Sequence, residues 1–98
     1  MAHRLAPQVE FELDDIWHYI ATESGSEEIA DRLIDSITDS FFLLANHPYV
    51  GRLRGDLRPG LRSFPVGQYI IIYRIEEADA LILHVMHSHR DIQKVFGN

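Results

Sequence analysis

Two apolar stripes at helical spacing dominate the first half of this 98-residue chain. In each stripe, apolar residues recur every three or four positions, which places them on one face of a helix. The first stripe is Val9, Leu13, Ile16, Trp17 and Ile20, and the second is Ala30, Leu33, Ile34, Ile37, Phe41 and Leu44. Only Ser24-Gly25-Ser26 separates them. A break this short predicts an antiparallel hairpin of two helices whose stripes share one core.

The ends of both helices have local signals. Pro7 suits the first turn of a helix, and we expect the first helix to run to about Glu23. Ser26 is a candidate N-cap for the second helix, with two acidic residues in the turn that follows; Ser24 paired with Glu27 is the rival cap. The second helix is expected to end before Pro48.

The remaining chain reads as extended segments and turns. His3-Arg4-Leu5 is a brief strand, and the span from Pro48 to Gly60, with two prolines and three glycines, is a long loop. Three extended stretches follow, separated by turn residues: Leu61 to Pro65, Tyr69 to Ile75, and Ala80 to His87. Asp91 is a candidate cap for a short terminal helix. The predicted fold is α+β: a helical hairpin on a small antiparallel sheet, in the order β-α-α-β-β-β with a short C-terminal helix.

Size and composition set further limits. A chain of 98 residues with 46% hydrophobic and 24% charged residues predicts one globular domain, 1–98. It contains no cysteine, so disulfides and thiolate metal sites are excluded, and we expect a cytoplasmic protein without a membrane span or cofactor.

The net charge of −6 is unevenly distributed. Residues 1–47 hold 2 basic and 10 acidic side chains, whereas residues 48–98 hold 7 and 5. Between Val50 and Arg74 there are 5 arginines and one acid, Asp56. This segment is suited to an anionic partner, because arginine stays charged and forks onto phosphate or carboxylate. Pairing with the chain's own carboxylates is the alternative.

Other features add candidates for binding rather than catalysis. The spacing of His84, His87 and His89 at the end of the last strand does not predict a metal site. Phe11 lies about 180° from the core face of its helix, and Phe42 with Leu43 makes the end of the second helix apolar nearly all round. These three residues predict a partner surface, unless the C-terminal tail folds back over them.

Several motifs resemble a known family. The most specific stretch is Pro59-Gly60-Leu61-Arg62-Ser63-Phe64-Pro65-Val66-Gly67, followed by Tyr73-Arg74 and His87-Ser88-His89-Arg90-Asp91, with further matches at Leu5-Ala6-Pro7, Asp15 to Ile20, Ala30 to Ile34 and Pro48 to Arg52. On these residues the chain resembles the ParE branch of the RelE/ParE toxin superfamily, the toxins of bacterial type II toxin-antitoxin systems. The resemblance covers essentially the whole chain and implies the same hairpin-on-sheet fold.

The resemblance implies a toxin that inhibits growth by poisoning DNA gyrase, and a cognate antitoxin, ParD-like or of another type II class, that silences it in a hetero-oligomer. RelE relatives instead cut mRNA on the ribosome, using basic residues with a tyrosine, or a histidine and a glutamate. Here no glutamate lies between Pro48 and Ile75 and no tyrosine lies near the C-terminus, but His87 and His89 keep an endoribonuclease open. A detoxified antitoxin-binding module is the third reading.

These considerations give two predicted surfaces and no catalytic residue. The target-contact set is Arg52, Arg54, Arg62, Arg74, His87, Arg90 and Phe96. The antitoxin-contact set is Phe11, Phe42 and Leu43, which would receive an amphipathic helix, with an extended segment added to a sheet edge.

Overall fold

The two apolar stripes form the expected hairpin in the computed structural model, which describes residues 2–96. Helix α1 is Gln8–Ser24 and helix α2 is Glu27–Asn46. Ser26 is the cap of α2, because its hydroxyl oxygen accepts the backbone N–H of Ile29 at 3.2 Å. The Ser24 hydroxyl instead donates to the carbonyl of Ile20 at 2.6 Å, so the rival cap is not used.

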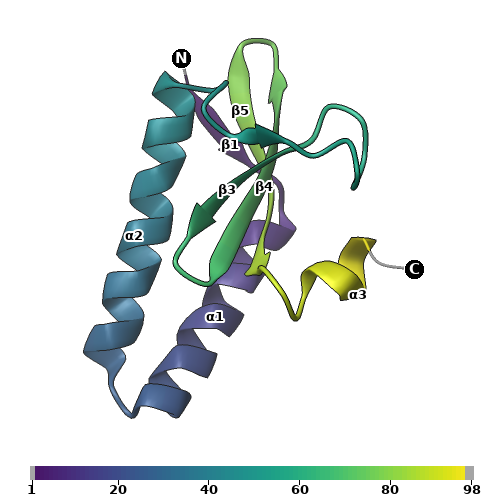
Figure 1. The fold of residues 1–98 in the computed structure, drawn as a ribbon. Helices are drawn as coiled ribbons and strands as arrows, with labels where there is room; N and C mark the ends of the chain where they lie inside the picture. The colour runs from purple at the N-terminus through teal and green to yellow at the C-terminus, as the bar shows by residue number, and fades with distance from the viewer. Residues whose placement is uncertain (1, 97–98) are drawn as a thin grey trace.

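The extended segments form one five-stranded sheet in the order β1-β5-β4-β3-β2 (Figure 1). The strands are β1 His3–Leu5, β2 Arg52–Leu53, β3 Arg62–Val66, β4 Tyr69–Glu76 and β5 Asp79–His87. Strands β3, β4 and β5 pair antiparallel in sequence, which confirms the predicted meander. Two-residue turns connect them, with a positive φ at Gly67 in the first and at Glu77 and Ala78 in the second.

Two details of the sheet differ from the prediction. The segment expected to be a loop contains β2, where Arg52 and Leu53 pair antiparallel with Ser63 and Arg62. The sheet is also mixed, because β1 lies parallel to β5 at one edge. Propensity at two or three residues cannot reveal such strands, since pairing with a long neighbouring strand stabilises them.

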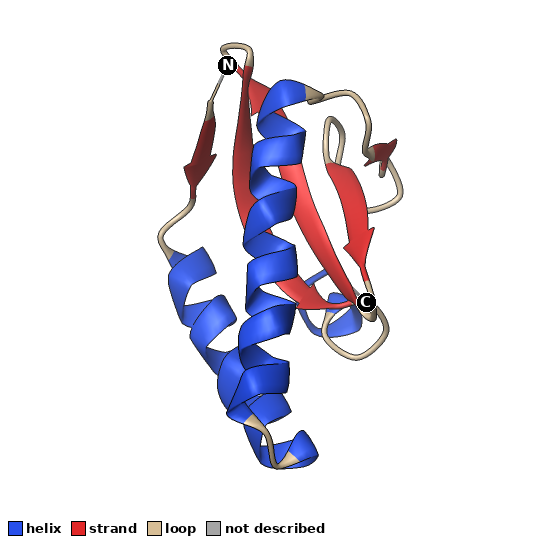
Figure 2. Ribbon diagram, turned by 90° about the vertical axis from the view of Figure 1, so that its left-hand side faces the viewer, coloured by secondary structure: helices blue, strands red, loops and turns tan. Residues whose placement is uncertain are grey.

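The sheet is buried on both faces. The helical hairpin covers one face (Figure 2), where Val9, Ile37, Phe41 and Leu44 pack with alternate residues of β4 and β5 in the main core. The opposite face carries a smaller cluster of Leu61, Ile70, Ile72, Met86 and Ile92, with Leu57, Leu83 and Phe96 packed against it. This second cluster explains why Tyr69 to Tyr73 is a continuous buried run rather than an alternating one.

The short helix α3, Ile92–Phe96, belongs to this second cluster. The prediction that the Asp91 side chain caps this helix is wrong. The Asp91 carboxylate accepts the backbone N–H of His87 at 3.3 Å, so it braces the turn that leaves β5 rather than an N–H of α3. The tail does not fold over the exposed phenylalanines either, because Phe96 lies against His84 and beneath the guanidinium of Arg58.

Candidate functional site

The loop after α2 is fixed to the sheet by one buried side chain. The hydroxyl of Tyr73 donates to the carbonyl of Pro48 at 2.8 Å and accepts the N–H of Gly51 at 2.9 Å. Burial of the ring raises the pKa of Tyr73. Between these two anchors the side chains of Tyr49 and Val50 are held outward and exposed.

Arg62 lies next to this loop and does not pair with a carboxylate among residues 2–96. Its guanidinium donates to the carbonyls of Tyr49 at 3.3 Å and Gly51 at 2.8 Å. It also lies over the Tyr49 ring, 5.1 Å from the ring centroid. Arg62 therefore orders the loop while keeping its positive charge uncompensated.

Arg54 is used differently. Its guanidinium forks onto Asp56, with Nη2 at 2.9 Å from Oδ2, and its side chain is only 16% exposed. Hydrogen bonding to Asp56 raises the pKa of Arg54 and lowers the pKa of the Asp56 carboxyl. The neighbouring Arg52 is exposed and contributes a smaller charge effect on Asp56, but forms no ion pair with any described carboxylate.

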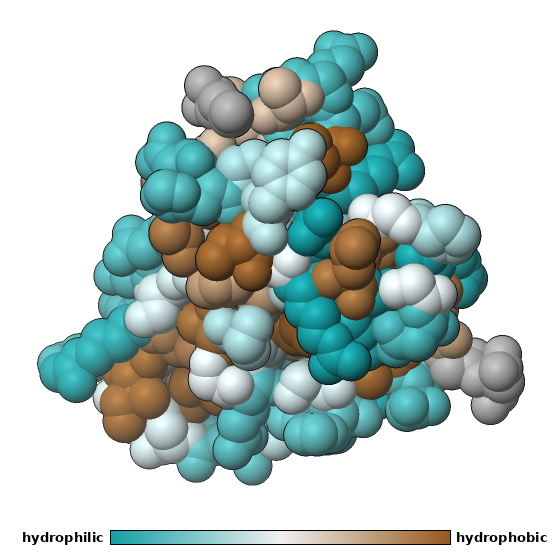
Figure 3. All heavy atoms as spheres, turned by 45° about the horizontal axis from the view of Figure 1, so that its top comes forward, coloured by the Kyte–Doolittle hydropathy of each residue, from teal (hydrophilic) through white to brown (hydrophobic). Residues whose placement is uncertain are grey.

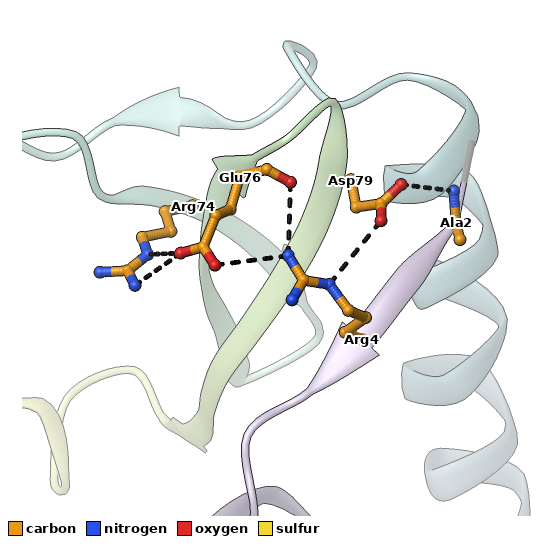
Figure 4. Close-up of polar contacts among 5 residues, drawn as sticks. All are labelled: Ala2, Arg4, Arg74, Glu76 and Asp79. Carbon is orange, nitrogen blue, oxygen red and sulfur yellow. Dashed lines mark hydrogen bonds and ion pairs between the residues drawn. The ribbon is translucent and has the colours of Figure 1, made fainter.

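Arg74 belongs to a network at the far end of β4 and β5 (Figure 4). Its Nη2 lies 2.7 Å from Oε2 of Glu76, and Arg4 of β1 reaches both Glu76, at 3.5 Å, and Asp79, at 3.7 Å. Hydrogen bonding and charge from Arg74, then from Arg4, lower the pKa of Glu76. Two arginines thus share two acids, and the charge of Arg74 is offset by Glu76.

Three further basic residues keep their positive charge. Arg90 lies over the ring of Tyr19 at 4.6 Å from its centroid, and Arg58 lies over Phe96 at 5.6 Å. Neither Arg58, Arg90 nor Lys94 forms an ion pair within residues 2–96. These cation–π contacts orient the guanidinium groups without neutralising them.

Both histidines of interest are held by hydrogen bonds. The Nδ1 atom of His87 accepts the backbone N–H groups of His89 at 3.1 Å and Arg90 at 3.0 Å. His84 Nδ1 lies 2.8 Å from Oε2 of Glu12, whose other oxygen accepts the N–H of Val85 at 2.9 Å. Sequence reasoning missed the His84–Glu12 pair, since its partners lie 72 positions apart.

The structure therefore distributes the predicted target-contact residues over three places. Arg52, Arg54 and Arg62 gather around β2 and the start of β3, Arg74 lies at the end of β4, and the others accompany the turn into α3. The sequence left open whether these arginines pair with the chain's own carboxylates. Within residues 2–96, Arg54 and Arg74 do so. Arg52, Arg62 and Arg90 form no such ion pair there. Sequence reasoning also missed the part that Tyr49 has in holding Arg62, because only the folded structure places the Arg62 guanidinium over the Tyr49 ring.

The predicted antitoxin-contact residues are on the surface. Phe11 is 72% exposed and Phe42 is 61% exposed, and Leu43 is also exposed. The ring of His3 packs edge-on against Phe42, with centroids 4.9 Å apart. Both phenylalanine rings are therefore accessible to a partner, and their assignment to the antitoxin contact stays a prediction.

Residues 2–96 contain no group of three histidine, aspartate or glutamate side chains placed to hold a metal ion. Neither long helix is apolar enough over its length to cross a membrane.

Comparison with known proteins gives a consistent result. Residues 4–92 match the family described as "ParE toxin of type II toxin-antitoxin system, parDE". Toxin ParE3 of Caulobacter vibrioides is 30% identical over 86 residues, covering 88% of this chain and 85% of the relative. Toxin ParE1 of the same organism is 28% identical over 95 residues, covering 97% of each.

A solved structure, titled "Chromosomal ParDE TA system from P. aeruginosa", has the same fold. It superposes with a TM-score of 0.77 at 19% sequence identity, covering 89% of this chain and 95% of that chain. Its agreement confirms the hairpin-on-sheet architecture.

Proposed function

Because this chain belongs to the ParE toxin family of type II toxin-antitoxin systems, we propose that it inhibits growth by binding DNA gyrase and trapping it on cleaved DNA. A cognate antitoxin, ParD-like or of another type II class, silences it in a hetero-oligomer. The proposal places the chain in the bacterial cytoplasm, where gyrase acts. Contact with the target is made by the basic residues that keep their charge, chiefly Arg52, Arg62 and Arg90, with His87 and Phe96 beside them.

The observation that carries a binding mechanism is that the guanidinium groups of Arg62 and Arg90 lie against backbone carbonyls and aromatic rings rather than against a histidine or a carboxylate. General acid–base catalysis needs a group free to take up and release a proton at the reacting atoms. The Nδ1 atom of His87 accepts two backbone N–H groups and the Nδ1 atom of His84 is paired with Glu12, so each of these two imidazoles has only its Nε2 atom left for proton transfer. Arg62 is surrounded by carbonyls and the Tyr49 ring rather than by a base.

The test uses purified toxin with gyrase and, in parallel, with translating ribosomes. We expect inhibition of supercoiling and accumulation of cleaved DNA, with intact mRNA. Arg90→Glu should weaken this inhibition, whereas Arg32→Glu, which changes the charge of an exposed arginine on α2 paired with Glu28, should not. Cut mRNA without any effect on gyrase would establish the endoribonuclease instead.

A growth assay distinguishes an active toxin from a detoxified antitoxin-binding module. Expression of the chain without an antitoxin should arrest growth and induce DNA-damage signalling. Normal growth at the same protein level, with antitoxin binding retained, would show that only the binding function remains.

A further inference from the structure

A hollow of about 430 Å³ lies at the edge of the sheet where β2 begins. Its walls are apolar, formed by Val50, Phe64, Pro65 and Ile70. Its polar lining consists of Arg52, Arg54 and Ser63. Figure 3 shows the end of the molecule around the α2–β2 connection, where brown apolar side chains emerge among teal hydrophilic ones.

The hollow exists because the chain joins the edge of the sheet only at Arg52. Strand β2 pairs with β3 only at Arg52 and Leu53. The next residue along the edge, Gly51, gives its N–H to the Tyr73 hydroxyl instead of to the sheet. Residues 64–66 of β3 consequently have no strand on their outer side within the described chain, and the space beside them stays open.

The charge of the hollow is opposite to that of the whole chain. No acidic side chain lines it. The Arg54 guanidinium is balanced by Asp56, but Arg52 is exposed and lies in no ion pair within residues 2–96. A chain with a net charge of −6 thus presents one positive, apolar-walled hollow. Such a site fits a segment that carries a carboxylate next to an apolar side chain.

The edge itself limits how that segment binds. Proline is tolerated in an edge strand where its missing N–H would face away from the neighbouring strand. Pro65 lies opposite Ile70 of β4 on the inner side of β3. Because proline has no backbone N–H, it offers no donor to a strand added on the outer side. Addition of a full strand along residues 64–66 is therefore disfavoured, and recognition depends on side chains.

We propose that this hollow receives an acidic, partly apolar segment of the cognate antitoxin, with a carboxylate on Arg52 and an apolar side chain against Pro65 and Ile70. The inference rests on the proposed function. The antitoxin is the occupant because a segment bound here covers Arg52, one of the residues that the proposed function assigns to target contact. Occupation of the hollow thereby contributes to silencing as well as to affinity.

The test measures the affinity of the full-length toxin for the product of the adjacent antitoxin gene. Arg52→Glu should raise Kd by about tenfold or more, since the charge-assisted hydrogen bond is lost and the new carboxylate repels that of the bound segment. The increase should persist in Arg52→Gln to a smaller extent. Arg32→Glu is the matched control, because it makes the same charge change at an exposed arginine of α2; its Kd should stay within about twofold of wild type.

A second readout uses salt. Wild-type binding should weaken more steeply with ionic strength than binding of Arg52→Gln, because one charge pair is lost. Equal Kd values for wild type and both Arg52 variants would overturn the inference while leaving the proposed function intact. No binding of the antitoxin to the wild-type toxin would instead contradict the proposed function itself.

Discussion

The phenolic oxygen of Tyr73 lies 2.9 Å from the backbone nitrogen of Gly51, and no side chain larger than hydrogen fits at that glycine. A Cβ atom built there would lie 2.7 Å from Cε1 and 2.8 Å from Cζ of the Tyr73 ring. Both residues are buried. The contact joins the loop after α2 to the centre of the sheet, and it decides where β2 begins.

The first prediction follows from this contact. Gly51→Ala should destabilise the fold by about 3 kcal/mol, because the ring is fully packed and must shift, which also lengthens its hydrogen bonds. The thermal midpoint should fall by more than about 10 °C. Gly55→Ala is the control, since its added Cβ meets nothing within 4 Å. Similar melting curves for the two variants would show that the contact at Gly51 does not constrain the loop.

The second prediction concerns alkaline pH. Burial raises the pKa of Tyr73 and of Tyr69 above the unfolded value, so the folded state favours the protonated phenols. The stability that this provides is complete below the unfolded pKa, about 10, and is lost as pH rises through the folded pKa. The free energy of unfolding should therefore fall as pH rises above about 10. Tyr73→Phe should be less stable at neutral pH but show a shallower alkaline decline.

The third prediction concerns acid pH. The pKa values of Asp56 and Glu76 are lowered by Arg54 and Arg74, so their stabilising contribution is present above the unfolded values, near 4, and is lost as pH falls through the folded values. Arg74→Gln should reduce the slope of stability against pH below about pH 4. An unchanged slope, measured by denaturant titration across this range, would mean that the Arg74–Glu76 pair does not persist in solution.

The sequence was sufficient for the helices and for the meander because these elements have periodicity over many residues. Val9 to Ile20 and Ala30 to Leu44 repeat with the helical period, and their buried members make the main core. The strand β2 could not be predicted in this way. Two residues contain no period. Strand β2 forms by pairing with β3, and it begins only at Arg52 because Tyr73, 22 positions after Gly51, accepts the N–H of that glycine.

The candidate site was predicted in composition but not in arrangement. The sequence shows that Val50 to Arg74 is rich in arginine, and this excess predicts a basic surface. It does not show that Arg54 and Arg74 are neutralised by Asp56 and Glu76, or that Arg62 rests on Tyr49. Each of those contacts depends on the direction in which a strand points its side chains, which only the folded register determines.

The fourth prediction concerns the turn between β4 and β5. Ala78 adopts a φ of 69°, a left-handed conformation that costs a residue with a Cβ about 1 kcal/mol. Glycine has no such penalty. Ala78→Gly should therefore raise the unfolding free energy by a few tenths to about 1 kcal/mol, since the greater entropy of unfolded glycine offsets part of the gain. A lower thermal midpoint for this variant would show that entropy outweighs the relief of strain.

The last prediction tests the exposed hairpin surface as the antitoxin contact. Phe42→Ala removes a ring that is 61% exposed, so the unfolding free energy should change little beyond the loss of its packing against His3. If an apolar face of an antitoxin helix covers this ring, its removal should weaken binding by about 2 kcal/mol, or roughly 30-fold. Ile29→Ala is the control, because Ile29 is also exposed on α2 but lies near its opposite end. Calorimetric titration of both variants with the antitoxin gives the comparison, and equal affinities would remove Phe42 from the contact surface.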